Sequence, residues 1–94
     1  MRERNKSSLI LRRLDYIRDM DIKNTIIELV KAEAGVERVN LEDKFMDDIA
    51  MSSLEIFSLI AEIEEQFNLK VVEEEIEGII SVRDLVELVQ RKLS

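Results

Sequence analysis

The sequence predicts an all-α protein, folded as a small four-helix bundle with three main helices and one short helix. Three long stretches carry apolar residues at helical spacing, and a short acidic segment between two of them has room for one or two helical turns. The chain has no proline and only two glycines, so sharp turns are few and helices are favoured. Its 94 residues suffice for one domain.

Residues 1–19 differ in charge from the rest of the chain. They hold six Lys/Arg and three Asp/Glu, a net charge of +3, whereas residues 20–94 hold eight and eighteen, a net charge of −10. We therefore divide the chain into a basic N-terminal extension, 1–19, and a domain, 20–94. The extension is expected to be a disordered or loosely packed tail. The alternatives are an arm that contacts a partner or a membrane, or a gene whose true start is Met20.

The first helix is expected over Asp21–Ala34. Its apolar residues recur at helical spacing, and Gly35 follows where a left-handed residue can end a helix. The loop after it should turn several apolar side chains inward, namely Val36, Val39, Leu41, Phe45 and Ile49.

The central helix is expected within Met51–Phe67. Ser52 and Glu55 form the S-x-x-E pattern of a capping box at its start. A wide apolar stripe should face the core, and it comprises Ile56, Leu59, Ile60, Ile63 and Phe67. A second, narrower stripe of Leu54, Phe57 and Ala61 is bordered by carboxylates, which indicates a docking surface for a partner protein. The carboxylates assigned to this surface are Glu55, Glu62, Glu64 and Glu65.

Two more helices are expected near the C-terminus. Glu73–Gly78 fits one or two helical turns, with acidic residues at the end where the helix dipole favours them. Ser81 and Asp84 have the spacing of an N-terminal cap for the last helix. Its apolar face comprises Val82, Leu85, Val86, Val89 and Leu93.

The composition excludes several functions. The chain has no cysteine and no histidine, so disulfides, zinc sites and thiol nucleophiles are absent and enzyme activity is not expected. Asp47 and Asp48 lack the spacing of a calcium loop, so no metal site is predicted. The acidic domain should repel nucleic acid and attract basic protein surfaces. Because no long apolar run or signal peptide is present, we expect a cytoplasmic protein without stable membrane insertion. We also expect it to be a monomer.

The segment from Phe45 to Phe67, which begins F-M-D-D-I-A-M-S-S-L-E, resembles the acyl carrier protein family. In that family a D-S-L-[DE] turn starts the second helix, and its serine carries 4′-phosphopantetheine. Ser53 matches this serine, and Leu54 and Glu55 follow in register. Ser52 stands where the family usually has Asp, and Ala50 where it often has Gly. The resemblance covers about Asp21 to Leu93.

The resemblance implies an acyl-carrier-protein-like bundle with 4′-phosphopantetheine attached covalently to Ser53 from coenzyme A. It implies a free-standing, non-catalytic carrier that delivers acyl thioesters to enzymes of fatty-acid, lipid or polyketide-type biosynthesis. Its partners would be a phosphopantetheinyl transferase and acyl-loading and acyl-transferring enzymes with basic docking surfaces. Residues matching the family's acyl cavity are Ile49, Ile60, Ile63, Phe67, Val71, Ile76, Ile79, Leu85 and Leu88.

Neutral Ser52 and Ser58 and bulky Phe57 depart from many fatty-acid carriers, which favours a specialised carrier over the general one. Two alternatives stay open. An aminoacyl or D-alanyl carrier would share the fold and the prosthetic group, whereas an unmodified helical adaptor would keep the fold alone.

Overall fold

The computed structural model describes residues 20–94, which contain four helices. The first is described over residues 20–34, and it is followed by α2 (Ser53–Phe67), α3 (Glu73–Glu77) and α4 (Val82–Leu93). The predicted all-α bundle with one short helix is confirmed. The extension, 1–19, and the expectations for it lie outside the described residues. No helix within 20–94 is long and apolar enough to cross a membrane.

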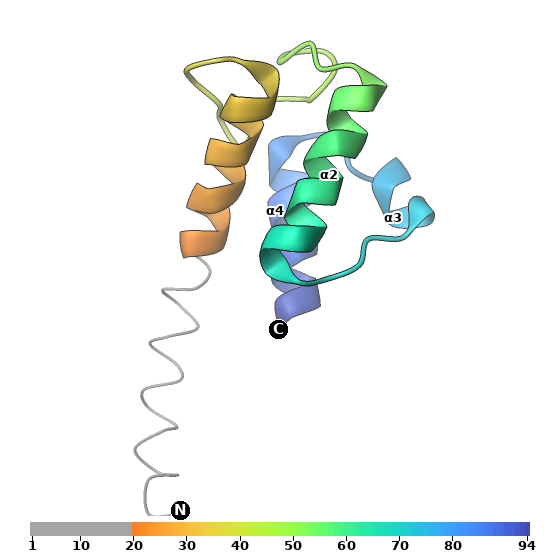
Figure 1. The fold of residues 1–94 in the computed structure, drawn as a ribbon. Coiled ribbons are helices and arrows are strands. Elements are labelled where there is room, and N and C mark those ends of the chain that lie inside the picture. Colours follow the sequence, from red (N-terminus) through yellow and green to blue (C-terminus); the bar gives the residue numbers. More distant parts are fainter. Residues whose placement is uncertain (1–19) are drawn as a thin grey trace, which may run out of the picture.

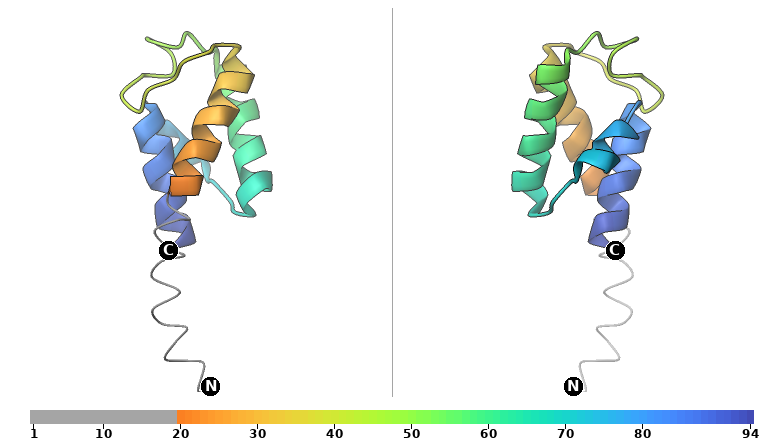
Figure 2. Two further views of the ribbon diagram at one scale, coloured as in Figure 1. Left: turned by 90° about the vertical axis from the view of Figure 1, so that its left-hand side faces the viewer. Right: turned by 90° about the vertical axis from the view of Figure 1, so that its right-hand side faces the viewer.

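The three long helices lie side by side, and α3 lies to one side of α2 and α4 (Figure 1). In Figure 1 the chain runs upward through the first helix, crosses in the long loop, and runs downward through α2. It runs downward again through α4, so α2 and α4 point in the same direction. Figure 2 shows α3 at the side of the bundle away from the first helix. Five residues long and without a fully buried side chain, α3 is the least enclosed of the helices that the structure describes.

The start and stop signals read from the sequence are present in the structure. Gly35 has φ +70° after the first helix, and its N–H donates to the carbonyl of Lys31 at 2.8 Å. Capping boxes begin α2 at Ser52 and α4 at Ser81. Asn68 ends α2 in the left-handed conformation, with φ 54°. Asn tolerates this conformation better than most residues with a Cβ, so it can end a helix where no glycine is present.

The main hydrophobic core lies between the first helix, α2 and α4. The predicted core stripe of α2 is confirmed, since Leu59, Ile60 and Ile63 are buried and Ile56 and Phe67 are partly buried. The other buried side chains of the main cluster come from the first helix, the loop and α4, namely Ile22, Ile26, Val30, Val39, Phe45, Met51, Val82, Leu85, Val86 and Val89. A smaller cluster of Ile60, Val71 and Leu88 closes the space between α2, α4 and the link to α3.

The long loop is fastened to the start of α4. Phe45 donates its N–H to the carbonyl of Ile80, and Val82 donates to the carbonyl of Asp43, both at 3.0 Å. Lys44 and Ser81 form an isolated antiparallel bridge between these segments. These hydrogen bonds keep residues 44–46 beside residues 79–81, so the loop and the link between α3 and α4 lie together near the start of α2.

Candidate functional site

Ser53 is the first residue of α2, and its side chain is exposed. The preceding residue forms the cap, because Ser52 Oγ accepts the N–H of Glu55 at 3.2 Å. The Glu55 carboxylate in turn accepts the N–H of Ser52 at 2.8 Å. Capping therefore uses Ser52 and Glu55 and leaves the Ser53 hydroxyl free for other chemistry.

The position of Ser53 suits a phosphodiester. The first N–H groups of a helix have no carbonyl one turn earlier to bond to, and they lie at the positive end of the helix dipole. Ser53 and Leu54 contribute two of these groups, since the cap engages the N–H of Glu55. An anion attached to Ser53 would meet unpaired N–H donors and a favourable potential without displacing the cap. The residues present thus fit a phosphate-linked prosthetic group.

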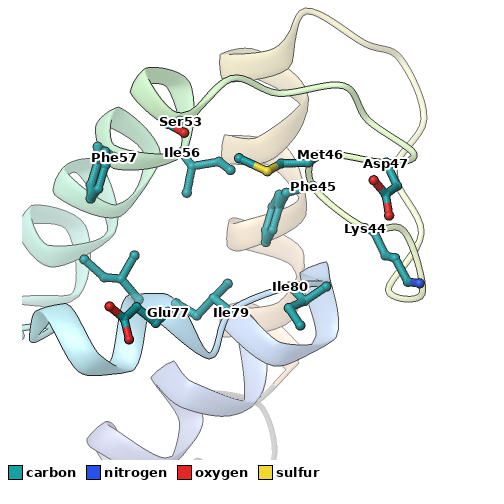
Figure 3. Close-up of a pocket in the computed structure, with 11 residues that line it drawn as sticks. Lys44, Phe45, Met46, Asp47, Ser53, Ile56, Phe57, Glu77, Ile79 and Ile80 are labelled. Carbon is teal, nitrogen blue, oxygen red and sulfur yellow. The ribbon is translucent and has the colours of Figure 1, made fainter.

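Ser53 also lies at the edge of an apolar groove of about 470 Å³ (Figure 3). The groove runs between the long loop, the first turns of α2, α3 and the link from α3 to α4. Lys44, Asp47 and Glu77 contribute its charged groups, and the remaining lining is apolar: Phe45, Met46, Ile56, Phe57, Ile76, Ile79 and Ile80. Its volume and lining are typical of a small-molecule site.

The predicted acyl-cavity residues divide into two groups. Ile76 and Ile79 line the groove. The other seven do not: Ile60, Val71 and Leu88 form the small buried cluster, Ile63 and Leu85 are fully buried in the main core, and Ile49 and Phe67 pack against that core. In this structure the bundle interior at these positions is filled by protein side chains, and the open apolar space lies nearer to Ser53.

The predicted docking stripe lies on the surface of α2. Leu54 is 81% exposed and Phe57 is 53% exposed, unusual fractions for large apolar side chains. Ala61 is exposed as well. An exposed apolar stripe on an otherwise well-packed helix is available to a partner protein.

The four carboxylates assigned to this surface are not equivalent. Glu62 and Glu65 are exposed. Glu55 accepts the N–H of Ser52 in the capping box, and Glu64 Oε2 accepts the N–H of Val71 at 2.8 Å. The last two side chains therefore stabilise the ends of α2, and Glu62 and Glu65 are the two exposed carboxylates of the set that a basic partner can reach.

Glu62 faces a carboxylate of the first helix. A hydrogen bond with Glu33 raises the pKa of Glu62 above its ordinary value, and desolvation and the charges of Glu33 and Glu65 act in the same direction. These groups concentrate negative potential on the side of α2 that faces the first helix. Among residues 20–94, no group of three acidic side chains has the arrangement of a metal site.

A partly buried ion pair fastens α3 to the bundle. Lys92 Nζ on α4 lies 2.9 Å from Glu75 Oε1. The N–H of Val72, followed by Lys92, holds the pKa of Glu75 below its ordinary value. At the other end of the link, the N–H groups of Ser81 and Ile80 lower the pKa of Asp84. These contacts place α3 so that Ile76 and Glu77 line the groove.

The sequence analysis missed Met46 and Ile80 as lining residues. Both lie outside the helices, in the loop and in the link before α4, where no periodic pattern marks an inward or outward side chain. Their proximity to Ser53 follows from the pairing of the loop with residues 80–82, which the sequence does not reveal. Both are more than half exposed, with fractions of 56% and 60%.

Comparisons with known proteins agree with this geometry. A family described as "Phosphopantetheine attachment site" matches residues 24–89. An acyl carrier protein from Wolinella succinogenes is 34% identical over 70 residues, which are 74% of this chain and 90% of the relative. The solved acyl carrier protein of Thermotoga maritima superposes with a TM-score of 0.68 at 27% identity, over 80% of this chain and 89% of that one.

A solved structure from Mycobacterium tuberculosis, also with a TM-score of 0.68, shares the fold at 22% identity over 70% of this chain and 90% of that one. The family match covers more than half of the chain, and the curated relative is matched over nearly its whole length. Members of the family are carriers rather than catalysts. The chain belongs to the acyl carrier protein family and carries covalently attached 4′-phosphopantetheine.

Proposed function

We propose that Ser53 is the attachment site and that the chain holds acyl intermediates as thioesters on the prosthetic group. The observation that carries this proposal is the exposed Ser53 hydroxyl at the first turn of α2, beside an apolar groove. Ser52 is the neighbouring alternative, but its Oγ already accepts the N–H of Glu55. The prosthetic group would supply the thiol that a chain without cysteine lacks.

The carrier would deliver its cargo to enzymes of fatty-acid, lipid or polyketide-type biosynthesis. We propose a specialised role, because neutral Ser52 and Ser58 and bulky Phe57 alter the charge and shape of the first turns of α2. We propose the cytoplasm as its compartment and residues 20–94 as the carrier domain, with 1–19 as an extension. The family match to residues 24–89 supports this boundary.

Partner enzymes would dock on the exposed stripe of α2. Leu54, Phe57 and Ala61 supply the apolar contact, and exposed Glu62 and Glu65 supply the charge. Such a surface fits partners that combine a small apolar pocket with basic residues at its rim, including the phosphopantetheinyl transferase and acyl-transferring enzymes. Glu55 and Glu64 would act indirectly, by holding the ends of α2 in place.

The attachment site can be tested by intact mass. The full chain is incubated with coenzyme A, Mg²⁺ and a broad-specificity phosphopantetheinyl transferase, and the gain of one phosphopantetheine is measured. The gain should vanish in Ser53→Ala and persist in Ser52→Ala. Because losing the cap should cost about 0.5–2 kcal/mol of stability, circular dichroism must first confirm that Ser52→Ala is folded.

The remaining outcomes of this experiment are equally informative. Persistence in Ser53→Ala with loss in Ser52→Ala would move the site by one residue. A folded wild-type chain that gains no mass under any condition would favour an unmodified helical adaptor.

A further inference from the structure

A shallow groove lies between the first helix and the last turn of α2. It has a volume of about 380 Å³ and is lined by Asn24, Thr25, Glu28, Leu29 and Gln66. Leu29 is partly buried and packs against the main core. Figure 2 shows the first helix beside α2, with α3 at the other side of the bundle. The shallow groove is therefore distinct from the groove beside Ser53, with which it shares no lining residue.

Carboxylates border the shallow groove one helical turn beyond its lining residues. Glu33 follows Leu29 by four residues on the first helix. Glu62 precedes Gln66 by four residues on α2. The carboxyl groups of Glu33 and Glu62 share a hydrogen bond, and Glu65 adds a third like charge nearby. Within residues 20–94, no Lys or Arg forms an ion pair with these three side chains, so an added cation would be favoured there.

The extension, 1–19, has the composition that complements this face. Its net charge is +3, against −10 for residues 20–94. Arg12 and Arg13 supply two adjacent cations, and apolar residues lie on both sides of them, namely Leu9, Ile10, Leu14 and Ile17. A segment with both cations and apolar side chains fits a groove that is bordered by carboxylates.

The extension is long enough to reach the shallow groove. It joins the first helix at Met20, at the end of the bundle where α2 also ends (Figure 1). At a rise of about 1.5 Å per residue, Leu29 lies about 14 Å and Glu33 about 20 Å along the helix from Met20. An extended chain covers about 3.3 Å per residue, so Leu14 can reach about 20 Å and Arg12 about 26 Å from Met20.

We propose that the extension folds back onto this face of its own chain, with Leu14 over the shallow groove and Arg12 and Arg13 beside the carboxylates of Glu33 and Glu62. Exposed ion pairs contribute little each, so the contact adds little to the stability of the fold. It persists because the covalent link at Met20 keeps the extension at high local concentration.

The docked extension covers charges that partner enzymes need. Glu62 and Glu65 are the exposed carboxylates of the proposed docking surface, so this consequence rests on the proposed function. The basic extension and a basic partner compete for the same carboxylates. The extension is thus an autoinhibitory segment, and its effect weakens as salt screens the charges.

A spin label in the full chain measures the contact. Because the chain has no cysteine, Ser8→Cys supplies a single thiol for a nitroxide. At low salt the label should broaden the backbone N–H signals of Glu33 and Glu62, although Glu33 lies about 20 Å along the helix from the point of attachment. The signals of Glu73 and Glu77 on α3, at the side of the bundle away from the first helix, should keep their intensity.

Paired variants of the extension identify the cations responsible. Arg12→Ser with Arg13→Ser should reduce the broadening at Glu33 by at least about half, since both ion pairs are removed. Arg2→Ser with Arg4→Ser makes the same change in net charge before the apolar residues begin, and it should retain the broadening.

Paired variants of the domain identify the carboxylates. Glu33→Gln with Glu62→Gln should reduce the broadening, whereas Glu73→Gln with Glu87→Gln, the same change in charge on α3 and α4, should retain it. A ¹⁵N-labelled chain without the label, mixed with an unlabelled chain that carries it, should show no broadening. Broadening in the mixture would assign the contact to a second copy and overturn the fold-back.

The rate of modification by the transferase tests the competition. If half of the molecules are docked, only half can bind a partner, so releasing the extension should raise the initial rate about twofold. Arg12→Ser with Arg13→Ser should show this increase at low salt and lose it at high salt. The control, Arg2→Ser with Arg4→Ser, corrects for the change in overall charge and should show a smaller increase.

The outcomes separate this inference from the proposed function. Equal broadening on α3 and on the first helix, or broadening that survives Arg12→Ser with Arg13→Ser, would overturn the docked extension and leave the carrier role intact. Selective broadening without any mass gain from the transferase would support the docked extension and remove the carrier role. Selective broadening with equal rates in both arginine pairs would overturn the competition with partners.

Discussion

Glu64 Oε2 accepts a hydrogen bond from the backbone N–H of Val71 at 2.8 Å, across seven residues of sequence. Val71 is only 8% exposed, so water has little access to replace this acceptor. The bond connects the last turn of α2 with the link to α3 and places Val71 against Ile60 and Leu88. A carboxylate that the helical pattern assigns to a docking surface is thus engaged in holding α3 beside the groove.

Removing this carboxylate should destabilise the fold. Glu64→Ala is expected to cost about 1–3 kcal/mol, because a buried N–H loses a charged acceptor. Glu65→Ala, at the exposed neighbouring position, should stay within about 0.5 kcal/mol of wild type. Urea denaturation of both variants measures the difference. Equal costs would mean that Glu64 contributes no more than an ordinary surface residue.

Replacing Ala50 with glycine should stabilise the fold, whereas the same replacement at an alanine within a helix should destabilise it. It has φ 62° just before α2, a conformation that costs a residue with a Cβ about 1–2 kcal/mol and glycine almost nothing. Allowing for the greater freedom of glycine in the unfolded chain, Ala50→Gly should stabilise by about 0.5–1 kcal/mol. The matched control is Ala61→Gly within α2, which should destabilise by about 1 kcal/mol. Thermal melting of the two variants should therefore shift in opposite directions.

Much of the fold could be predicted from the sequence because its signals are local. Ser52 with Glu55, and Ser81 with Asp84, mark helix starts through contacts three residues apart. The core stripe of α2 follows from helical spacing alone. Ser53 was predicted from a short motif that resembles the attachment turn of the acyl carrier protein family and is followed by the expected helix.

The rest depends on contacts between distant segments. Met46 and Ile80 line the same groove because Phe45 donates its N–H to the carbonyl of Ile80, a pairing of two irregular segments that no sequence period encodes. The helical pattern assigned both Glu64 and Glu65 to the docking surface, but only the path of the chain after Asn68 brings the N–H of Val71 to Glu64. The groove was missed for the same reason.

Because we propose residues 20–94 as the carrier domain, we expect the extension, 1–19, to be dispensable for stability. A chain that starts at Met20 should melt within a few degrees of the full chain, since 1 kcal/mol corresponds to about 4–8 °C in a domain of this size. Calorimetry of both chains provides the comparison. A much larger loss would assign Leu9, Ile10, Leu14 and Ile17 to the folded core.

The carboxyl pair of Glu33 and Glu62 should make stability fall with increasing pH. The hydrogen bond with Glu33 raises the pKa of Glu62 above 4.5, so the folded state binds more protons than the unfolded state between 4.5 and the raised value. The stabilisation that comes from the more tightly held proton on Glu62 is complete below this pH window and is lost as pH rises through it. Glu62→Gln should therefore raise the melting temperature most near neutral pH, with a smaller gain toward pH 4.5.

A double-mutant comparison isolates this pair. In a Glu33→Gln background, Glu62→Gln should have a much smaller effect, because the main cause of the raised pKa has been removed. An undiminished effect in that background would assign the gain to Glu65 or to the overall acidic charge instead.

Substitutions of charged and of apolar residues on the docking stripe of α2 should differ in how their effects depend on salt. Charges at an exposed rim act mainly on association, within a Debye length of about 8 Å at physiological ionic strength, whereas an apolar contact in a partner's pocket acts on dissociation. Glu65→Lys should therefore slow modification by the transferase most at low salt. Leu54→Ala should slow it by a similar factor at low and high salt, with little loss of stability because this side chain is 81% exposed.

Two variants elsewhere on the surface serve as controls. Glu87→Lys on α4 makes the same change in net charge away from the stripe, and Val72→Ala removes a half-exposed apolar side chain outside it. If Glu87→Lys slows the transferase as much as Glu65→Lys does, the partner responds to the overall acidity of the domain. If Leu54→Ala has no more effect than Val72→Ala, the stripe on α2 is not the surface that the transferase contacts. A selective loss in both α2 variants would place the partner on the helix that begins with Ser53, because an exposed apolar stripe and exposed carboxylates there adjoin the proposed attachment residue.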